Sequence, residues 1–179
     1  MPPSLTVRVC RADYANPVHA EALVSLLDAY ARDPMGGGEA LSDFAKVNLV
    51  PSLAARPQAF SVLAFALLAA ESIEQPVGLV NCIEGFSTFS CLPLVNVHDV
   101  AVLPGYRGHG VGEKMLVLAE TLARERGACK MTLEVLQGNA SAARLYRRVG
   151  FDNYQLDPAM GQAHFMQKWL ASTESANPS

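Results

Sequence analysis

The sequence predicts an α/β (α+β) fold in which helices pack on a sheet of about seven strands. Two observations predict this class. Apolar segments with the two-residue period of strands alternate along the chain with segments that have the 3.6-residue period of helices. Two successive apolar segments are separated by Gln75-Pro76, which is typical of the turn of an antiparallel hairpin. With 179 residues, 50% of them hydrophobic, the chain is long enough for one domain with a full core.

The first half of the chain predicts one strand, two helices and three further strands. The first strand is LTVRV, residues 5–9, and the first helix spans residues 17–33, where apolar side chains recur at helical spacing. A second helix over residues 40–55 is expected to be interrupted at Pro51. The three strands are expected at residues 60–70, 77–86 and 95–102.

The second half predicts two helices and three strands. One helix follows a glycine-rich loop and ends at Gly127, and a shorter one is capped by Asn139 and ends at Gly150. The strands are expected at residues 130–136, 151–155 and 163–170. We therefore expect one domain over residues 1–170, followed by a small, polar and disordered tail over residues 171–179.

Composition excludes several classes of protein. The net charge of −3 lacks the basic excess of a protein that binds nucleic acid through its phosphates. The longest apolar run, residues 59–70, is far shorter than the roughly 20 residues of a membrane span, and the N-terminal residues lack the pattern of a secretory signal. The four cysteines are too scattered for a disulfide scaffold or a C-x-x-C site. We expect a cytoplasmic protein with no metal, no membrane partner and no nucleic-acid partner.

The stretch GYRGHGVGEKML, residues 105–116, combines four glycines with one arginine at the start of a predicted helix. Glycine costs roughly 0.5–1 kcal/mol relative to alanine inside regular structure, so the cluster indicates a close approach to the backbone. Free N–H groups at a helix N-terminus bind phosphate. The stretch lacks the Gly-Lys-Ser/Thr of a P-loop and the spacing and position of a Rossmann fingerprint, so both of those nucleotide sites are excluded.

A second motif, NASAARLYRRVGF, follows at residues 139–151, and with it the sequence resembles the GNAT superfamily of N-acetyltransferases. The family pattern R/Q-x-x-G-x-G/A is matched by Arg107, Gly110 and Gly112. The resemblance is close over residues 95–151 and implies a mixed, largely antiparallel sheet with helices on both faces. The family pattern N-x-x-A-x-x-L-Y-x-x-x-G-F is matched at Asn139, Ala142, Leu145, Tyr146, Gly150 and Phe151.

The resemblance implies acetyl-CoA as the cosubstrate, bound in a gap where the fourth and fifth strands diverge. Backbone groups of residues Val100, Ala101 and Val102 would then contact the pantetheine. Asn139 and Tyr146 would line the same site. The resemblance also allows a homodimer, because many members form one. The pyrophosphate would be held by the loop residues Arg107, Gly108, His109, Gly110, Val111 and Gly112.

The reaction of this family needs a neutral amine, a stabilised oxyanion and a proton donor for the departing thiolate. Tyr146 matches the family's proton-donating tyrosine, and a backbone N–H near Val100 would meet the oxyanion. Two residues are open as the general base. Glu134 matches a glutamate of members that acetylate protein N-termini, whereas His98 lies on the fourth strand, where other members carry a basic or carboxylate group. Strand alternation puts His98 on the face of Asn96 and Val100, with Asp99 on the opposite face.

The acceptor is less defined by the sequence. Gln137-Gly138 stands where acetyltransferases of protein N-termini usually carry an arginine and a polar residue, so their substrate does not transfer. The predicted first helical pair is acidic, which suits a cationic amine and equally a solvated helix surface. The function predicted is an acetyl-CoA-dependent N-acetyltransferase of a small molecule or peptide; the alternative is a non-catalytic acyl-CoA-binding regulatory module. The acidic residues are Asp28, Asp33, Glu39 and Asp43.

Overall fold

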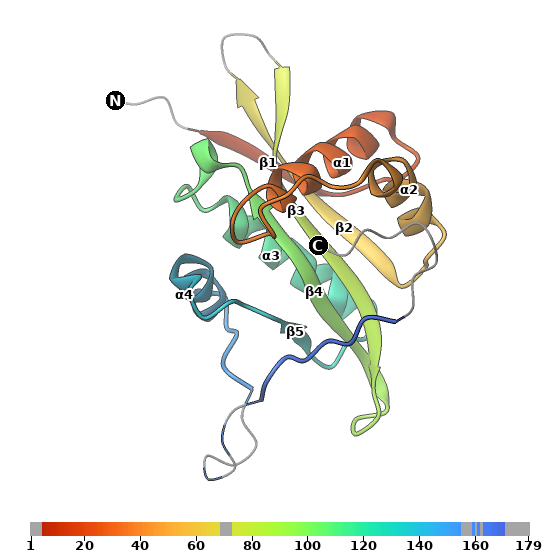
Figure 1. Cartoon of the computed structure of the whole chain (residues 1–179), viewed down its shortest axis with the longest axis vertical. Coiled ribbons are helices and arrows are strands. Elements are labelled where there is room, and N and C mark those ends of the chain that lie inside the picture. Colours follow the sequence, from red (N-terminus) through yellow and green to blue (C-terminus); the bar gives the residue numbers. More distant parts are fainter. Residues whose placement is uncertain (1–4, 69–72, 155–158, 160, 162, 171–179) are drawn as a thin grey trace.

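The computed structural model describes residues 5–68, 73–154, 159, 161 and 163–170. Its centre is a five-stranded sheet in the order β1-β2-β3-β4-β5 (Figure 1). The first four strands pair antiparallel, and β4 pairs with β5 in parallel. The sheet is thus mixed and largely antiparallel, as predicted. The strands are β1 (Thr6–Arg11), β2 (Ala59–Leu68), β3 (Ile73–Ser87), β4 (Leu92–Val102) and β5 (Met131–Leu133).

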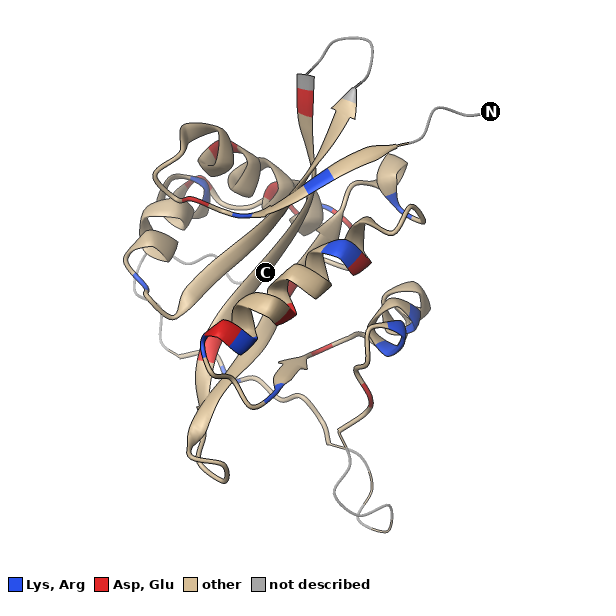
Figure 2. Cartoon of the chain, turned by 180° about the vertical axis from the view of Figure 1, so that it is seen from behind, with Lys and Arg blue, Asp and Glu red and all other residues tan. Residues whose placement is uncertain are grey.

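Helices cover both faces of the sheet. Figure 1 shows α1 and α2 on one face, and the view from behind in Figure 2 shows α3 lying across the other. A short 3-10 turn, Pro104–Tyr106, connects β4 to the glycine loop before α3. No helix in the described ranges is long and apolar enough to cross a membrane. The helices are α1 (Pro17–Ala31), α2 (Asp43–Ala54), α3 (Val111–Glu125) and α4 (Ala140–Arg148).

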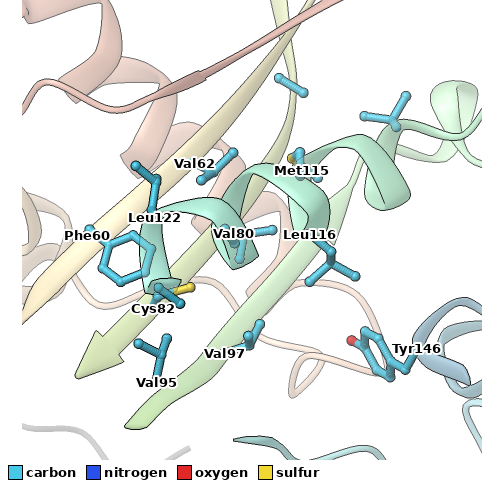
Figure 3. Packing of buried hydrophobic residues seen from close by; sticks show 14 of the residues in the cluster. Phe60, Val62, Val80, Cys82, Val95, Val97, Met115, Leu116, Leu122 and Tyr146 are labelled. Atoms are coloured by element: carbon cyan, nitrogen blue, oxygen red, sulfur yellow. The ribbon is translucent and has the colours of Figure 1, made fainter. Parts of the chain in front are cut away.

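The largest part of the core lies between α3 and the sheet. Met115 and Leu116 of α3 are almost fully buried and pack on strand residues such as Val80 and Val97 (Figure 3). Burial of each such side chain stabilises the fold by about 1.5–3 kcal/mol. A smaller cluster on the other face joins Leu23 and Leu26 of α1 to the sheet. This packing fixes α3 firmly, so its N-terminus has a defined place at the end of β4.

The contact between β4 and β5 is short. Only Val95, Asn96 and Val97 pair with β5, whereas β4 continues to Val102. The two parallel strands therefore separate beyond Val97. This is the gap between the fourth and fifth strands that the resemblance to N-acetyltransferases implies.

Strand β4 contains an irregularity that alternation did not predict. Asn81 of β3 is paired with Asp99, but the next residue, Cys82, is paired with Val97. His98 is therefore the extra residue of a β-bulge, which shifts every later side chain of β4 by one face. Val97 and Val100 both pack toward α3, while Asp99 bonds to Asn81 on the α1 face. The expected alternation is thus wrong beyond His98, because the bulge puts Asp99 on the face of Asn96 and Val100 on the opposite face.

Four local predictions need correction. Gln75-Pro76 lies inside β3, paired with β2, and the connection of the hairpin falls on residues 69–72, outside the described residues. Pro51 lies inside α2, at its last turn, where it removes one hydrogen bond without ending the helix. The strand expected at 130–136 has only three residues, and about seven strands become five in the described ranges.

The two missing strands are those of the C-terminal segment. The described residues 151–154 and 163–170 have no strand structure. Apolar alternation creates a strand only where a neighbour supplies a ladder of backbone hydrogen bonds, and β5 offers three residues of edge. Phe165, Met166 and Trp169 are accordingly exposed. The disordered tail predicted at 171–179 lies outside the described residues.

Candidate active site

A cavity of about 620 Å³ opens where β4 and β5 separate. Its walls come from the end of β4, the glycine loop, the N-terminus of α3, the segment after β5, α4 and the end of α1. Two predicted residues lie outside its lining: His109, which is exposed on the loop, and His98, which lies on β4. The cavity brings together the other predicted residues, namely Val100, Ala101, Val102, Arg107, Gly108, Gly110, Val111, Gly112, Glu134, Asn139 and Tyr146.

The glycines of the loop have two different roles. Gly108 and Gly110 adopt positive φ angles of 80° and 75°, which L side chains rarely adopt. Gly110 is the N-cap of α3 and has no side chain to satisfy the first N–H groups of the helix, and Gly110, Val111 and Gly112 line the cavity. At Gly112, a Cβ would lie 2.8 Å from Leu145. This third glycine lets α4 approach α3, so only part of the cluster serves the cavity directly.

Arg107 connects the loop to the end of α1. Its Nε donates to the Val102 carbonyl at 2.9 Å, and its guanidinium also donates to Asp33 at 2.8 Å. The Arg107 hydrogen bond holds the pKa of Asp33 below its usual range, helped by the Met35 amide. The arginine thereby fixes the loop against both β4 and the first helical pair.

Two further arginines of the cavity were not selected from the sequence. Arg144 and Arg148 line it from α4, where Figure 2 shows basic residues gathered on one short helix. Arg148 is paired with Glu113 at 2.8 Å. Both arginines stand at unspecified positions of the Asn-x-x-Ala motif, and their positive charge beside a predicted phosphate site was the signal that could have found them.

Tyr146 is held in the wall of the cavity at 9% exposure. Its ring projects from α4 toward β4 (Figure 3) and packs edge-on against Phe151, with centroids 6.1 Å apart. Burial raises the pKa of Tyr146 to about 12, and the nearby Tyr30 adds to the effect. The phenol therefore keeps its proton at neutral pH and is a permanent hydrogen-bond donor.

The two base candidates belong to one hydrogen-bond network. The amide nitrogen of Asn96 lies 3.3 and 3.4 Å from the two carboxylate oxygens of Glu134, and 3.2 Å from the hydroxyl of Thr132. The amide oxygen of Asn96 lies 3.3 Å from Nδ1 of His98. Sequence reasoning treated His98 and Glu134 as separate alternatives, and it did not select Asn96, which joins them.

A second polar chain leads to Asp99 from inside the sheet. Ser61 and Asn81 are buried, and the hydroxyl of Ser61 donates to the Asn81 amide oxygen at 2.6 Å. Because that bond uses the only hydroxyl proton of Ser61, Tyr14 must donate to Ser61, at 2.9 Å. The Asn81 amide nitrogen then donates to Asp99 at 2.9 Å. Each hydrogen bond of this series is therefore donated in the direction of Asp99, whose carboxylate is its final acceptor.

A profile of the acetyltransferase (GNAT) family matches residues 21–151 of the chain. The chain belongs to this family. Over 68 residues it is 44% identical to streptothricin acetyltransferase from Streptomyces lavendulae, a match that covers 38% of this chain and only 36% of that protein. The membership confirms the family that the two motifs predicted.

Solved structures agree on the fold. The crystal structure of a probable acetyltransferase has a TM-score of 0.71 and 21% identity, with 92% of this chain and 99% of the other covered. The aminoglycoside N-acetyltransferase AAC(6')-Iy, solved in complex with CoA, has a TM-score of 0.67 and 14% identity, with 94% and 98% covered. At such identities the likeness shows the GNAT fold alone, and it confirms the predicted class.

Two acidic residues of the first helical pair, Asp28 and Asp33, already form ion pairs within this GNAT chain. Asp28 is bonded to Arg32 at 3.0 Å and to Lys46 at 3.3 Å. Burial would raise the pKa of Asp28, but these partners and the Leu41 amide together lower it. Asp33 is bonded to Arg107. These two carboxylates already have cationic partners inside the chain, whereas Asp99 and Glu134 have only neutral partners within hydrogen-bond distance among the described residues.

Proposed function

We propose that the protein transfers the acetyl group of acetyl-CoA to an amine. The observation that carries this function is the meeting, in one cavity, of the free N–H groups at the start of α3, the arginines of α4 and the buried Tyr146. The first two suit phosphate groups, and the third suits a departing thiolate. The direct test is consumption of acetyl-CoA with a library of amines. A protein that binds acetyl-CoA and acetylates none of them would support the alternative of a regulatory module.

The fit of acetyl-CoA to the cavity rests on its two ends. We assign the pyrophosphate to the loop Arg107–Gly112, because the left-handed Gly108 and Gly110 leave the amides of α3 uncovered. We assign the pantetheine to Val100, Ala101 and Val102, because within the described ranges β4 has no partner strand on the β5 side beyond Val97. Arg144 is a further phosphate ligand in this proposal. The cosubstrate supplies an acyl thioester, and the amine attacks the carbonyl carbon of this thioester.

In the proposed reaction the amine nitrogen forms a bond to the acetyl carbon and the carbon–sulfur bond breaks. The amine loses one proton to a base, and the released thiolate takes one from the solvent. The ordinary pKa of a thiol, near 8.5, lies well below the value of about 12 for Tyr146. Tyr146 therefore stabilises the developing thiolate mainly as a hydrogen-bond donor, since complete loss of its own proton is unfavourable. We assign the base to the network of His98, Asn96 and Glu134.

For the acceptor we propose a small amine with more than one positive charge. Support comes from Asp99 and Glu134, two carboxylates without a cationic partner in the described part of the chain, on the side of the sheet that α1 covers. A decisive library contains streptothricin, an aminoglycoside such as sisomicin, simple monoamines and a peptide with a free N-terminus. We expect kcat/KM to be highest for a multiply charged small molecule. Preference for the peptide would contradict the proposal.

We also propose a cytoplasmic location, because a reducing compartment suits cysteines that carry free thiols. The homodimer allowed by the family resemblance stays a prediction. Cell fractionation tests the first, and analytical ultracentrifugation tests the second. The free cysteines are Cys10, Cys82, Cys91 and Cys129.

A further inference from the structure

We propose that Asn96 is a positioning residue through which Glu134 holds His98 in the Nδ1–H tautomer, so that Nε2 of His98 accepts the proton of the amine. The catalytic meaning of this inference rests on the proposed acetyl transfer. The tautomer itself does not, since it follows from hydrogen bonds within the chain. Three observations carry the inference: the contact of Glu134 with Asn96, the contact of Asn96 with His98, and the exposure of the His98 ring.

The first step fixes which way the Asn96 amide faces. An ionised carboxylate accepts hydrogen bonds and cannot donate them. Both oxygens of Glu134 lie within 3.4 Å of one end of the Asn96 amide. That end must be the NH₂ group, because the amide oxygen in its place would face two acceptors. The Thr132 hydroxyl, 3.2 Å away, accepts from the same group. Asn96 is thus bound both by Thr132 of β5 and by Glu134, which follows β5.

The second step fixes the proton on the imidazole. With its NH₂ group committed to Glu134, Asn96 turns its amide oxygen toward Nδ1 of His98, at 3.3 Å. An amide oxygen only accepts, so Nδ1 must be the protonated nitrogen. The neutral ring then carries a free lone pair on Nε2, on the side of the ring away from Asn96. The charge of Glu134 thus selects the tautomer of a residue that it does not touch.

The third step is that the His98 ring needs a hydrogen-bond partner to select its tautomer. His98 is the extra residue of the β4 bulge and is exposed, so burial does not hold its ring. A free imidazole in water favours the other tautomer, with the proton on Nε2, which would leave no acceptor on the outer side of the ring. Asn96 and His98 lie two residues apart on one face of β4, and Glu134 directly follows β5. The bulge and the parallel pairing bring the three together.

Nitrogen-15 NMR of the imidazole tests the tautomer directly, without substrate. The spectrum is recorded at about pH 8.5, where an ordinary imidazole is neutral. We expect the wild-type protein to show the Nδ1–H tautomer at His98, and Asn96→Leu to shift it to Nε2–H. Glu134→Lys should also give Nε2–H, because an ammonium donates to the Asn96 oxygen and turns the amide around. Thr132→Val is the matched control and should keep the wild-type tautomer, because Glu134 still fixes Asn96.

Turnover separates this inference from the proposed function. We expect Asn96→Leu to lower kcat by about tenfold, the lower end of the 10–100-fold range for groups that orient a functional histidine in metal sites, with KM for acetyl-CoA unchanged. If Asn96→Leu does not fold, the exposed Glu134→Lys decides the point. A wild-type Nε2–H tautomer, or a tautomer unmoved by both variants, overturns the inference even in an active enzyme. The expected tautomers in a protein without turnover would leave the tautomer established and remove its catalytic meaning.

Discussion

The two faces of the sheet are built differently. On one face, α3 buries seven residues, and the groups offered to a ligand at its N-terminus are backbone amides. On the other, α1 buries three residues and α2 none, and the groups on offer are side chains of β4 and of the segment after β5, joined by hydrogen bonds. Packing is more extensive on the first face, where glycine geometry also shapes the loop, whereas individual polar contacts arrange the groups offered on the second. We infer that single substitutions change cosubstrate affinity on the α3 side and acceptor chemistry on the α1–α2 side.

Tyr146 offers the strongest test of the comparison, because it lies in the cavity that we propose for acetyl-CoA, but its proposed role is in the chemical step. Tyr146→Phe should lower kcat by about 10²–10⁴-fold, since the hydrogen bond to the thiolate matters mainly in the transition state. The dissociation constant for acetyl-CoA should change little. Steady-state kinetics and calorimetry measure the two. Tyr106→Phe is the matched control, because Tyr106 lines the same cavity but directs its hydroxyl to Gln75. Near-native turnover of Tyr146→Phe would mean that water, and not Tyr146, supplies the hydrogen bond to the developing thiolate.

The next largest effect is expected at the proposed base. At pH 7, His98→Ala should lose at least about tenfold in kcat/KM and recover part of it at pH 9, where more of the acceptor amine is already neutral. Glu134→Gln should lose less, because the glutamine oxygen still accepts from Asn96. Folded variants that both keep the wild-type pH profile would show that neither residue is the base.

A glycine of the loop tests the cosubstrate side alone. Gly110→Val should raise the dissociation constant for CoA at least about tenfold, equal to about 1.4 kcal/mol, because it covers the amides of α3. The φ angle of 75° also disfavours valine, so folding should be checked by thermal unfolding. Gly105→Val is the matched control, since Gly105 lies in the 3-10 turn just before the loop, has ordinary φ and has open space around it. Equal affinities of the two variants would contradict the loop assignment.

The smallest effect is expected at the contact that joins the two sides. Asp33→Asn removes the ion pair with Arg107, and because both side chains are partly exposed, the free energy of unfolding should fall by less than about 1 kcal/mol. Since Arg107 lowers the pKa of Asp33 in the folded state, the pair stabilises above the unfolded pKa of about 3.9 and is lost as pH falls through the folded value. Urea unfolding should therefore show a difference from wild type at pH 7 that shrinks below about pH 4. A constant difference across that range would mean that the ion pair does not contribute.

The sequence by itself determined the groups that we propose for binding the cosubstrate. The loop glycines, the helix that follows them and Tyr146 in its motif were predicted from residues 95–151, and the structure brings them together in one cavity. These features are local: a positive φ strongly favours glycine at that residue, and a helix N-terminus leaves its first amides without intrahelical partners wherever it lies. The family followed from the same two motifs.

Only the tertiary structure decided the arrangement of the groups that we propose for the base and the acceptor. The bulge at His98 arises from the register between β3 and β4, and it alone puts Asp99 and Asn96 on one face. The contacts of Asn96 with Glu134 join residues 38 positions apart, and that of Arg107 with Asp33 joins residues 74 apart. For the same reason, the described residues 151–154 and 163–170 do not form the two strands that we expected there. Alternation specifies which side chains would face a sheet, but it does not specify whether a neighbouring strand is present. Such contacts depend on the pairing of distant segments, which no local pattern of residues records.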